Sequence, residues 1–218
     1  MADIIAIDGP VASGKGSVSA GVAKVLGFHV LDSGALYRLA GTACVKEGVS
    51  LDDQAAVTKV AENMKPLFKD GRIYLNDEDV TDVIRTEEAG LNASQIAAYP
   101  TVRDALFQLQ RRCAQEPGLV ADGRDMGAVV FPDACLKIFL TASAESRAKR
   151  RYNQLKEKGI DSKIDDLVSD LKERDRRDTE RAVAPLKPAE GARILDSSEL
   201  TLQETIDKVL SWYREIRP

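Results

Sequence analysis

The chain has 218 residues, 44% hydrophobic and 30% charged, which is the balance of a globular protein rather than a disordered one. Its 31 Lys and Arg against 35 Asp and Glu give a formal net charge of −4, which argues against a general nucleic-acid binder but leaves a local basic patch open. Three cysteines without CxxC spacing, no apolar run of roughly 18 residues and no charged secretory start predict a cytoplasmic protein without a disulfide framework, zinc site or membrane span.

The N-terminal part predicts a strand, a loop and a helix. Residues 4–7 form a continuous apolar run that ends at turn residues, as a strand buried on both faces does. After a glycine-containing loop, apolar residues recur at helical spacing over 18–26, and Gly27 stands where a helix cap is expected. Residues 28–31 predict a second strand, which ends at the turn-forming residues 32–34.

Three later apolar runs, residues 119–121, 137–140 and 193–195, also predict buried strands. Enough chain separates each from the next for a helical crossover, and such alternation is typical of a parallel sheet. We therefore expect an α/β fold, with a five-stranded parallel sheet flanked by helices in a single domain over residues 1–218.

The middle of the chain shows a different pattern. Lys69-Asp70-Gly71-Arg72 carries an Asp-Gly hairpin signal, and a second polar turn follows at 76–79, so we expect an antiparallel meander. Two helices should follow, the second beginning at Pro100. This predicts a small α+β insertion at about 62–98. Near the C-terminus, residues 201–204 form a capping-box pattern that begins an amphipathic helix.

Residues 9–15 fit the pattern GxxxxGK between the first strand and the first helix. Glycines let successive backbone N–H groups turn inward around a phosphate, the helix N-terminus adds partial positive charge, and Lys15 adds a full one. The pattern predicts an ATP-binding loop with a solvent-facing lysine; the alternative is a glycine-rich turn. Its predicted ATP-binding residues are Gly9, Pro10, Val11, Ala12, Ser13, Gly14, Lys15, Gly16 and Ser17.

A nucleotide-binding loop does not by itself define the reaction. No NKxD run is present, which argues against a regulatory GTPase. Gly16 replaces the usual Ser or Thr after the lysine and Ser17 follows, and this GKG-hydroxyl pattern resembles the loop of nucleoside monophosphate kinases. The segments LDSGALYR at 31–38, NASQ at 92–95, ADGRDMG at 121–127 and RAVAPL at 181–186 narrow the resemblance to the bacterial cytidylate kinases, over essentially the whole chain.

The resemblance implies an enzyme of pyrimidine nucleotide metabolism that transfers the γ-phosphoryl group of ATP to CMP or dCMP, giving ADP and CDP or dCDP. It implies a monophosphate-binding region at about 36–115, which contains the insertion, and a helical lid at about 150–170 with a hinge over 156–162. Mg²⁺ would accompany ATP, near Ser17 and, through water, Asp122. No nucleic-acid or membrane partner is expected, and a monomer is the default.

The resemblance also assigns roles to individual residues. Arg38, Arg124 and Arg181 would hold the acceptor phosphate, Ser94, Arg174 and Asp178 the ribose, and Ser33, Arg103 and Asp125 the cytosine. The implied catalytic residues are Lys15, Arg124, Arg151, Arg174 and Arg181.

Taken without the resemblance, the same residues allow other interpretations. Residues 32–34 suit a strand-ending turn, Asp122 suits a helix cap, and the arginine-rich runs 147–151 and 174–178 suit solvated helix faces. Two other functions stay open: a kinase for a different small acceptor, and a catalytically idle nucleotide-binding module or ATPase switch.

Overall fold

The computed structural model describes residues 2–69, 72–157, 159 and 161–217. The chain forms two compact units. The first, here called the sheet unit, comprises Met1–Leu31 and Cys113–Pro218, and the second, the insert unit, comprises Asp32–Arg112. Each unit is described by itself.

The sheet unit is built on a five-stranded sheet with the strand order β2-β6-β1-β7-β8. Its strands are β1 (Asp3–Asp8), β2 (His29–Asp32), β6 (Gly118–Gly123), β7 (Leu136–Thr141) and β8 (Arg193–Asp196). β1 pairs in parallel with β6 and β7, and β7 with β8. Most of the apolar residues of the central strands are buried, as in strands covered on both faces; Ile5 and its partner Val120, for example, are both fully buried. The predicted five-stranded parallel sheet is confirmed.

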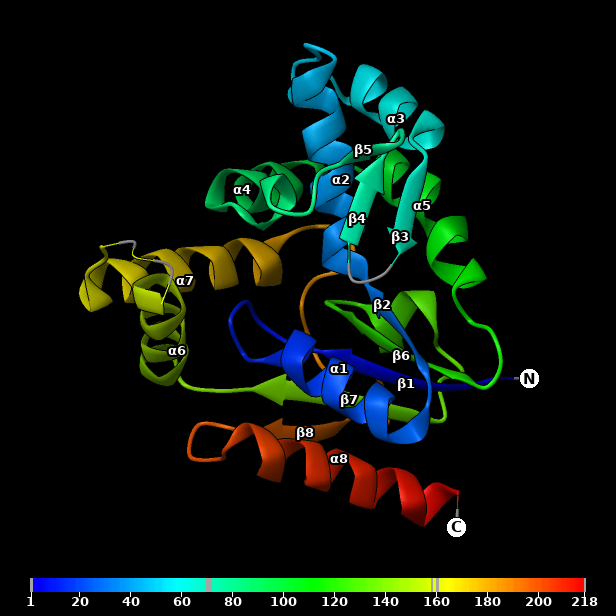
Figure 1. The fold of residues 1–218 in the computed structure, drawn as a ribbon, viewed down its shortest axis with the longest axis vertical. Coiled ribbons are helices and arrows are strands. Elements are labelled where there is room, and N and C mark those ends of the chain that lie inside the picture. The colour runs from blue at the N-terminus through cyan, green and yellow to red at the C-terminus, as the bar shows by residue number, and fades with distance from the viewer. Residues whose placement is uncertain (1, 70–71, 158, 160, 218) are drawn as a thin grey trace. The chain divides into compact units, whose positions relative to one another are not determined.

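Helices α1 (Lys15–Leu26) and α8 (Leu202–Ile216) lie side by side on one face of this sheet (Figure 1). Their apolar stripes meet the inner strands in one core cluster, in which Val22 of α1 and Val209 of α8 are fully buried. The helices approach closely at Gly21, where an added Cβ would lie 2.3 Å from Ile206 Cδ1. Within the described residues, no helix is both long and apolar enough to cross a membrane.

Helices α6 (Ala144–Glu157) and α7 (Ile164–Glu180) lie against each other in the sheet unit (Figure 1). They contain the predicted lid. The apolar residues of α7 are only partly buried: Leu171 is buried, whereas Ile164 is 43% exposed. The predicted hinge at 156–162 includes residues 158 and 160, which lie outside the described residues.

The insert unit combines helices with a small sheet. Its elements are α2 (Ser33–Lys46), α3 (Gln54–Asn63), β3 (Pro66–Lys69), β4 (Arg72–Leu75), β5 (Glu78–Asp79), η1 (Val83–Arg85), α4 (Glu87–Ile96) and α5 (Pro100–Arg112). β3, β4 and β5 pair antiparallel, which confirms the meander, and α4 and α5 are the two expected helices. The Asp70–Gly71 turn lies outside the described residues. The second turn is shorter than predicted, because Glu78 and Asp79 pair with β4.

Candidate active site

The loop between β1 and α1 has the backbone shape of an anion site. Gly9 is required because an added Cβ would lie 2.0 Å from Leu140 O. Ala12 and Gly14 have positive φ values of 59° and 92°, and such alternation of handedness turns successive N–H groups toward one point. Gly14 is the N-cap of α1 and has no side chain to cap the first N–H groups of the helix. Ser13 Oγ is buried without a hydrogen-bond partner among the described residues. These donors suit a phosphate.

Lys15 lies over this loop and is buried, with only 5% of its surface exposed. The expectation of a solvent-facing lysine is wrong, because the side chain folds back and its Nζ donates a hydrogen bond to Pro10 O at 2.8 Å. Burial, and then repulsion by Arg124, lower the pKa of Lys15 to about 8, while attraction to Asp122 and Asp8 opposes the shift. The ammonium group is therefore held at the phosphate loop.

Two arginines of α6 hold the outer side of the loop. Arg147 Nη1 donates to Val11 O at 3.0 Å, and Arg150 Nη1 donates to Ser13 O at 3.0 Å. Arg147 is buried and also forms a two-pronged ion pair with Asp175 of α7, one bond of which measures 3.0 Å. Arg147 is therefore not on a solvated helix face, and the sequence analysis assigned it no role. Both arginines bind backbone carbonyl oxygens of the loop from its outer side. They thereby favour a loop conformation in which the backbone N–H groups point inward.

Asp122 and Ser17 are the predicted magnesium residues. Asp122 is buried within β6, so it caps no helix, and its Oδ2 lies 3.4 Å from where a Cβ on Gly16 would stand. The carboxylate thus faces the first turn of α1, where Ser17 is exposed. Among the described residues no cluster of three His, Cys, Asp or Glu side chains could hold a metal. One carboxylate and one hydroxyl fit Mg²⁺, which keeps several waters and binds phosphate oxygens.

The chain that leaves β6 carries two more predicted residues. Arg124 Nε donates to Asp178 Oδ2 of α7 at 2.9 Å, so the structure brings together residues assigned to the acceptor phosphate and to the ribose. Asp125 follows and is buried. Arg181 ends α7, and its Nε donates to Ala184 O at 2.7 Å. The other two predicted arginines of this unit are half-buried, Arg151 on α6 and Arg174 on α7.

Asp8, at the carboxyl end of β1, has a role in this region that the sequence analysis missed. It is only 3% exposed, and its two carboxylate oxygens accept the backbone N–H groups of Met126 and Gly127, each at 2.8 Å. Burial raises the pKa of Asp8 to about 6, although both N–H bonds and Lys15 favour the ionised form. The only sequence signal was an aspartate before the first loop glycine.

In the insert unit, the start of α2 holds two predicted features. Asp32 Oδ1 accepts a hydrogen bond from Ala35 N at 3.0 Å as the N-cap of α2, so residues 33–34 begin a helix and do not form the strand-ending turn. Ser33 Oγ donates to Gln110 Oε1 at 2.7 Å, and both residues are buried. Gln110 was missed because, 77 residues away, it carries no motif of its own.

The remaining predicted residues of the insert unit are Arg103, Arg38 and Ser94. Arg103 is buried, and its guanidinium carbon lies 5.9 Å from the centroid of the Tyr37 ring. Arg38 Nη1 donates to two carbonyl oxygens, Ile84 O at 2.9 Å and Thr86 O at 3.1 Å. Ser94 is half-buried on α4.

Comparison with known proteins identifies the family. The family model described as cytidylate kinase matches residues 5–215. The chain is 55% identical to the cytidylate kinase of Burkholderia ambifaria (strain MC40-6) over 213 residues, which is 98% of this chain and 93% of that protein. It is 53% identical to the cytidylate kinase of Cupriavidus necator over 218 residues, 100% of this chain and 98% of that protein.

Among solved structures, an uncharacterized protein from Eubacterium ventriosum is similar with a TM-score of 0.52 and 11% identity, over 96% of this chain and 97% of that one. At that identity the likeness supports the fold alone. The match over nearly the whole sequence goes further, and it agrees with the resemblance that the motifs indicated: this chain belongs to the cytidylate kinase family.

Proposed function

We propose that the residues described above carry out the family's reaction in the roles that the sequence resemblance implies. Membership of the family makes the chain a nucleoside monophosphate kinase, which phosphorylates CMP or dCMP with ATP. The observation that carries the proposal is the phosphate loop, where positive φ values at Ala12 and Gly14 give the backbone the shape of an anion site and the buried Lys15 binds a loop carbonyl. Backbone N–H groups and a lysine gathered at one loop stabilise the negative charge of bound phosphates.

On the donor side, residues 9–17 hold the phosphates of ATP. Lys15 gives up its hydrogen bond to Pro10 O and binds the β- and γ-phosphate oxygens. The unpaired Ser13 hydroxyl supplies one further donor. Ser17, and Asp122 through water, hold Mg²⁺, which neutralises charge on the phosphates when it is bound.

On the acceptor side, Arg38, Arg124 and Arg181 bind the phosphate of CMP. That phosphate is largely ionised at neutral pH, so its oxygen attacks without a strong general base and no covalent intermediate forms. Guanidinium groups instead neutralise the charge that spreads over the transferred group, and here Arg151 and Arg174 of α6 and α7 contribute. Closure of the lid excludes water, so that ATP is not hydrolysed.

Cytosine recognition follows from hydrogen-bond polarity. Cytosine offers an N4 amino donor beside the N3 and O2 acceptors, whereas uracil offers an O4 acceptor and an N3–H donor. The carboxylate of Asp125 accepts from N4, and the Arg103 guanidinium donates to N3 and O2, with Ser33 beside the base. Ser94, Arg174 and Asp178 bind the ribose. The Arg124–Asp178 ion pair supports this assignment, because it holds a phosphate-binding residue beside a ribose-binding one.

The remaining parts of the proposal concern the setting of the enzyme. We place it in the cytoplasm as a monomer with small-molecule substrates only, without a nucleic-acid or membrane partner. The net charge of −4 supports the first of these exclusions.

The experiment is a coupled assay of ADP release by the full chain with MgATP and CMP, dCMP, UMP or AMP. We expect CMP and dCMP to give much the highest kcat/KM. Equal or higher values with AMP would indicate a different acceptor. ADP release that no acceptor accelerates would instead indicate an ATPase.

A further inference from the structure

Asp8 binds the backbone of the short segment that follows β6. Within the β1–β6 ladder its Cα partner is Gly123, the last residue of β6. Its carboxylate then accepts the N–H groups of Met126 and Gly127, at 2.8 Å each, although 118 and 119 residues separate them in sequence. The residues between these fixed points are Arg124 and Asp125. One buried side chain therefore anchors the segment that contains both residues.

The same anchor fixes the turn that follows. Met126–Val130 forms η2, and Asp125 O accepts the N–H groups of Val129 at 2.9 Å and Val130 at 3.2 Å. The carbonyl group of Asp125 is thus bound by the end of η2. The first two N–H groups of η2 are bound by Asp8. Before Asp125 in the chain, Arg124 is bound to Asp178. Loss of the Asp8 bonds would release the backbone between Gly123 and η2.

We infer that Asp8 is a positioning residue for the acceptor nucleotide, and that its paired hydrogen bonds hold Arg124 and Asp125 in the orientation that binds CMP. The inference rests on the proposed roles of Arg124 and Asp125. The side-chain hydrogen bonds of Asp8 go to the backbone that follows Arg124 and Asp125 and not to the phosphate loop, so its effect should fall on the acceptor rather than on ATP.

The chemistry of the contact requires a carboxylate. Two backbone donors need two acceptor atoms, and Asp8 supplies both in one rigid group. An asparagine would present one oxygen and one NH₂ group, so one N–H donor would face another. Burial disfavours the ionised form of Asp8, with Asp125 as a like charge and Lys15 as an opposite one nearby.

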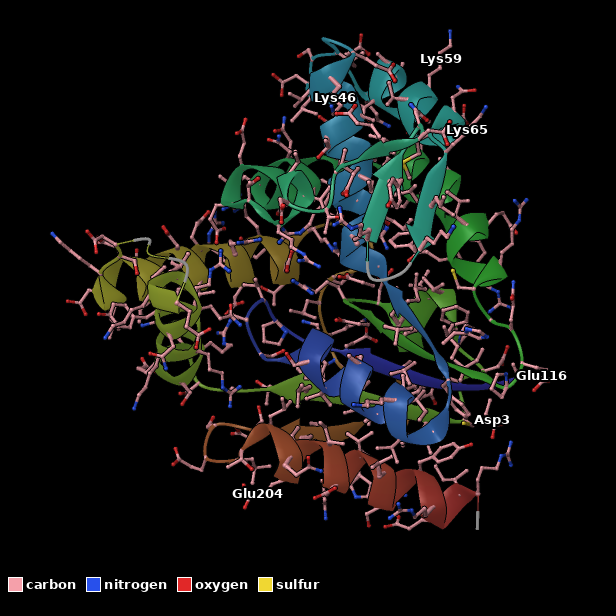
Figure 2. All side chains as sticks on the ribbon, viewed as in Figure 1. Asp3, Lys46, Lys59, Lys65, Glu116 and Glu204 are labelled. Carbon is pink, nitrogen blue, oxygen red and sulfur yellow. The ribbon has the colours of Figure 1, made fainter. Side chains whose placement is uncertain are left out.

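The test compares Asp8→Asn with Asp3→Asn by steady-state kinetics and thermal unfolding. Asp3 begins the same strand, and its carboxylate also accepts several hydrogen bonds, from Tyr213 and Arg217, at the opposite end of β1 (Figure 2). Asp8→Asn should raise KM for CMP by about 10-fold or more and leave KM for ATP within about twofold, in an enzyme whose melting temperature falls but stays above the assay temperature. Asp3→Asn should lower the melting temperature and leave both KM values unchanged.

A folded Asp8→Asn variant with an unchanged KM for CMP would overturn the inference. If Asp8→Asn does not fold, Asp8→Ser removes the charge and keeps one acceptor, and the same rise in KM for CMP is expected. Unfolding of both variants would make Asp8 structural and would overturn the inference equally. Asp125→Asn, measured in parallel, separates the two proposals: if only Asp125→Asn weakens CMP binding, the role of Asp8 fails while that of Asp125 stands.

Discussion

Buried charge is the dominant feature of the site at the scale of single residues. Lys15 and Asp8 are both buried. Burial lowers the pKa of Lys15 and raises that of Asp8, so in both it favours the neutral form. Charges so placed cost stability unless something offsets their desolvation, and here backbone groups do so: Pro10 O for Lys15, and the N–H groups of Met126 and Gly127 for Asp8. Such placement is typical of residues kept for function.

Lys15→Ala is expected to lower kcat/KM with MgATP and CMP by about 100-fold or more, because it removes the full positive charge beside the phosphates that react. The fold should persist, since the substitution also removes a desolvated charge. Lys24→Ala is the matched control, because Lys24 lies exposed on the last turn of the same helix. Both kinetics and circular dichroism are measured. An Lys15→Ala enzyme as fast as the Lys24→Ala enzyme would contradict the assignment of the phosphate loop.

The lowered pKa of Lys15 predicts a pH dependence. Below about pH 8 the amine is protonated and binds phosphate; above it the free enzyme loses this charge. Because kcat/KM reports ionisations of the free enzyme, kcat/KM for ATP should fall above about pH 8, while kcat at saturating ATP changes less. Initial rates between pH 6.5 and 9.5 check this. A flat kcat/KM profile over that range would mean that Lys15 stays charged throughout.

The residues of the site were predictable where a local motif carries them. Residues 9–17 and Arg124 were predicted as site residues because they lie in local motifs. The burial of the Lys15 side chain was not, because it depends on a hydrogen bond to Pro10 O that the motif does not specify. Asp8, Gln110 and Arg147 were missed because each has a hydrogen-bond partner 77 to 136 residues away in sequence. Contacts at that separation are set by the topology of the fold and not by a local pattern.

At the scale of elements, helix α8 shows how a local signal and tertiary packing agree. Thr201 Oγ1 accepts the Glu204 N–H at 3.2 Å, and Glu204 Oε2 accepts the Thr201 N–H at 2.8 Å, at the start of the helix (Figure 2). The apolar face behind this cap is buried against the sheet, with Val209 fully buried. The capping box was predicted from sequence and is confirmed.

Thr201→Ala should lower the free energy of unfolding by about 1 kcal/mol, since it removes the side-chain acceptor at the N-cap. Ser211→Ala is the matched control, because it removes a hydroxyl from an exposed position inside the same helix and should change stability by less than about 0.5 kcal/mol. Urea unfolding measures both. Equal stability of the two variants would show that the capping box contributes nothing. Activity should be unchanged in both.

Other elements gave weaker signals, for identifiable reasons. Strands of the main sheet were predicted because continuous apolar runs mark strands buried on both faces. Helix α2 was not predicted: ten of its fourteen residues are buried, so its sequence lacks the polar face that gives a helix its period. Strand β5 has only two residues, both acidic, and exists through its pairing with β4.

At the scale of the whole molecule, sheet order decides which residues meet. In the order β2-β6-β1-β7-β8, the carboxyl ends of the two neighbouring strands β1 and β6 carry Asp8 and Asp122 at one edge, where ligands of open α/β sheets bind. The sequence predicted five parallel strands but not their order, because order depends on crossovers between distant segments. The insert unit, Asp32–Arg112, interrupts this sheet in sequence. The predicted region boundaries, 36–115 and 62–98, stay predictions.

The central claim is that this chain selects cytosine through hydrogen-bond polarity, with Asp125 as the acceptor for N4. Sites built on such bonds reject a wrong partner by up to about 10⁴-fold, because buried polar groups are then left unpaired. The most direct measurement is kcat/KM for CMP and for UMP in the wild type and in Asp125→Asn. The account predicts that the variant loses far more activity toward CMP than toward UMP, so that the ratio narrows by about 10-fold or more. Loss of the same factor with both substrates would contradict it and would make Asp125 structural or phosphate-directed.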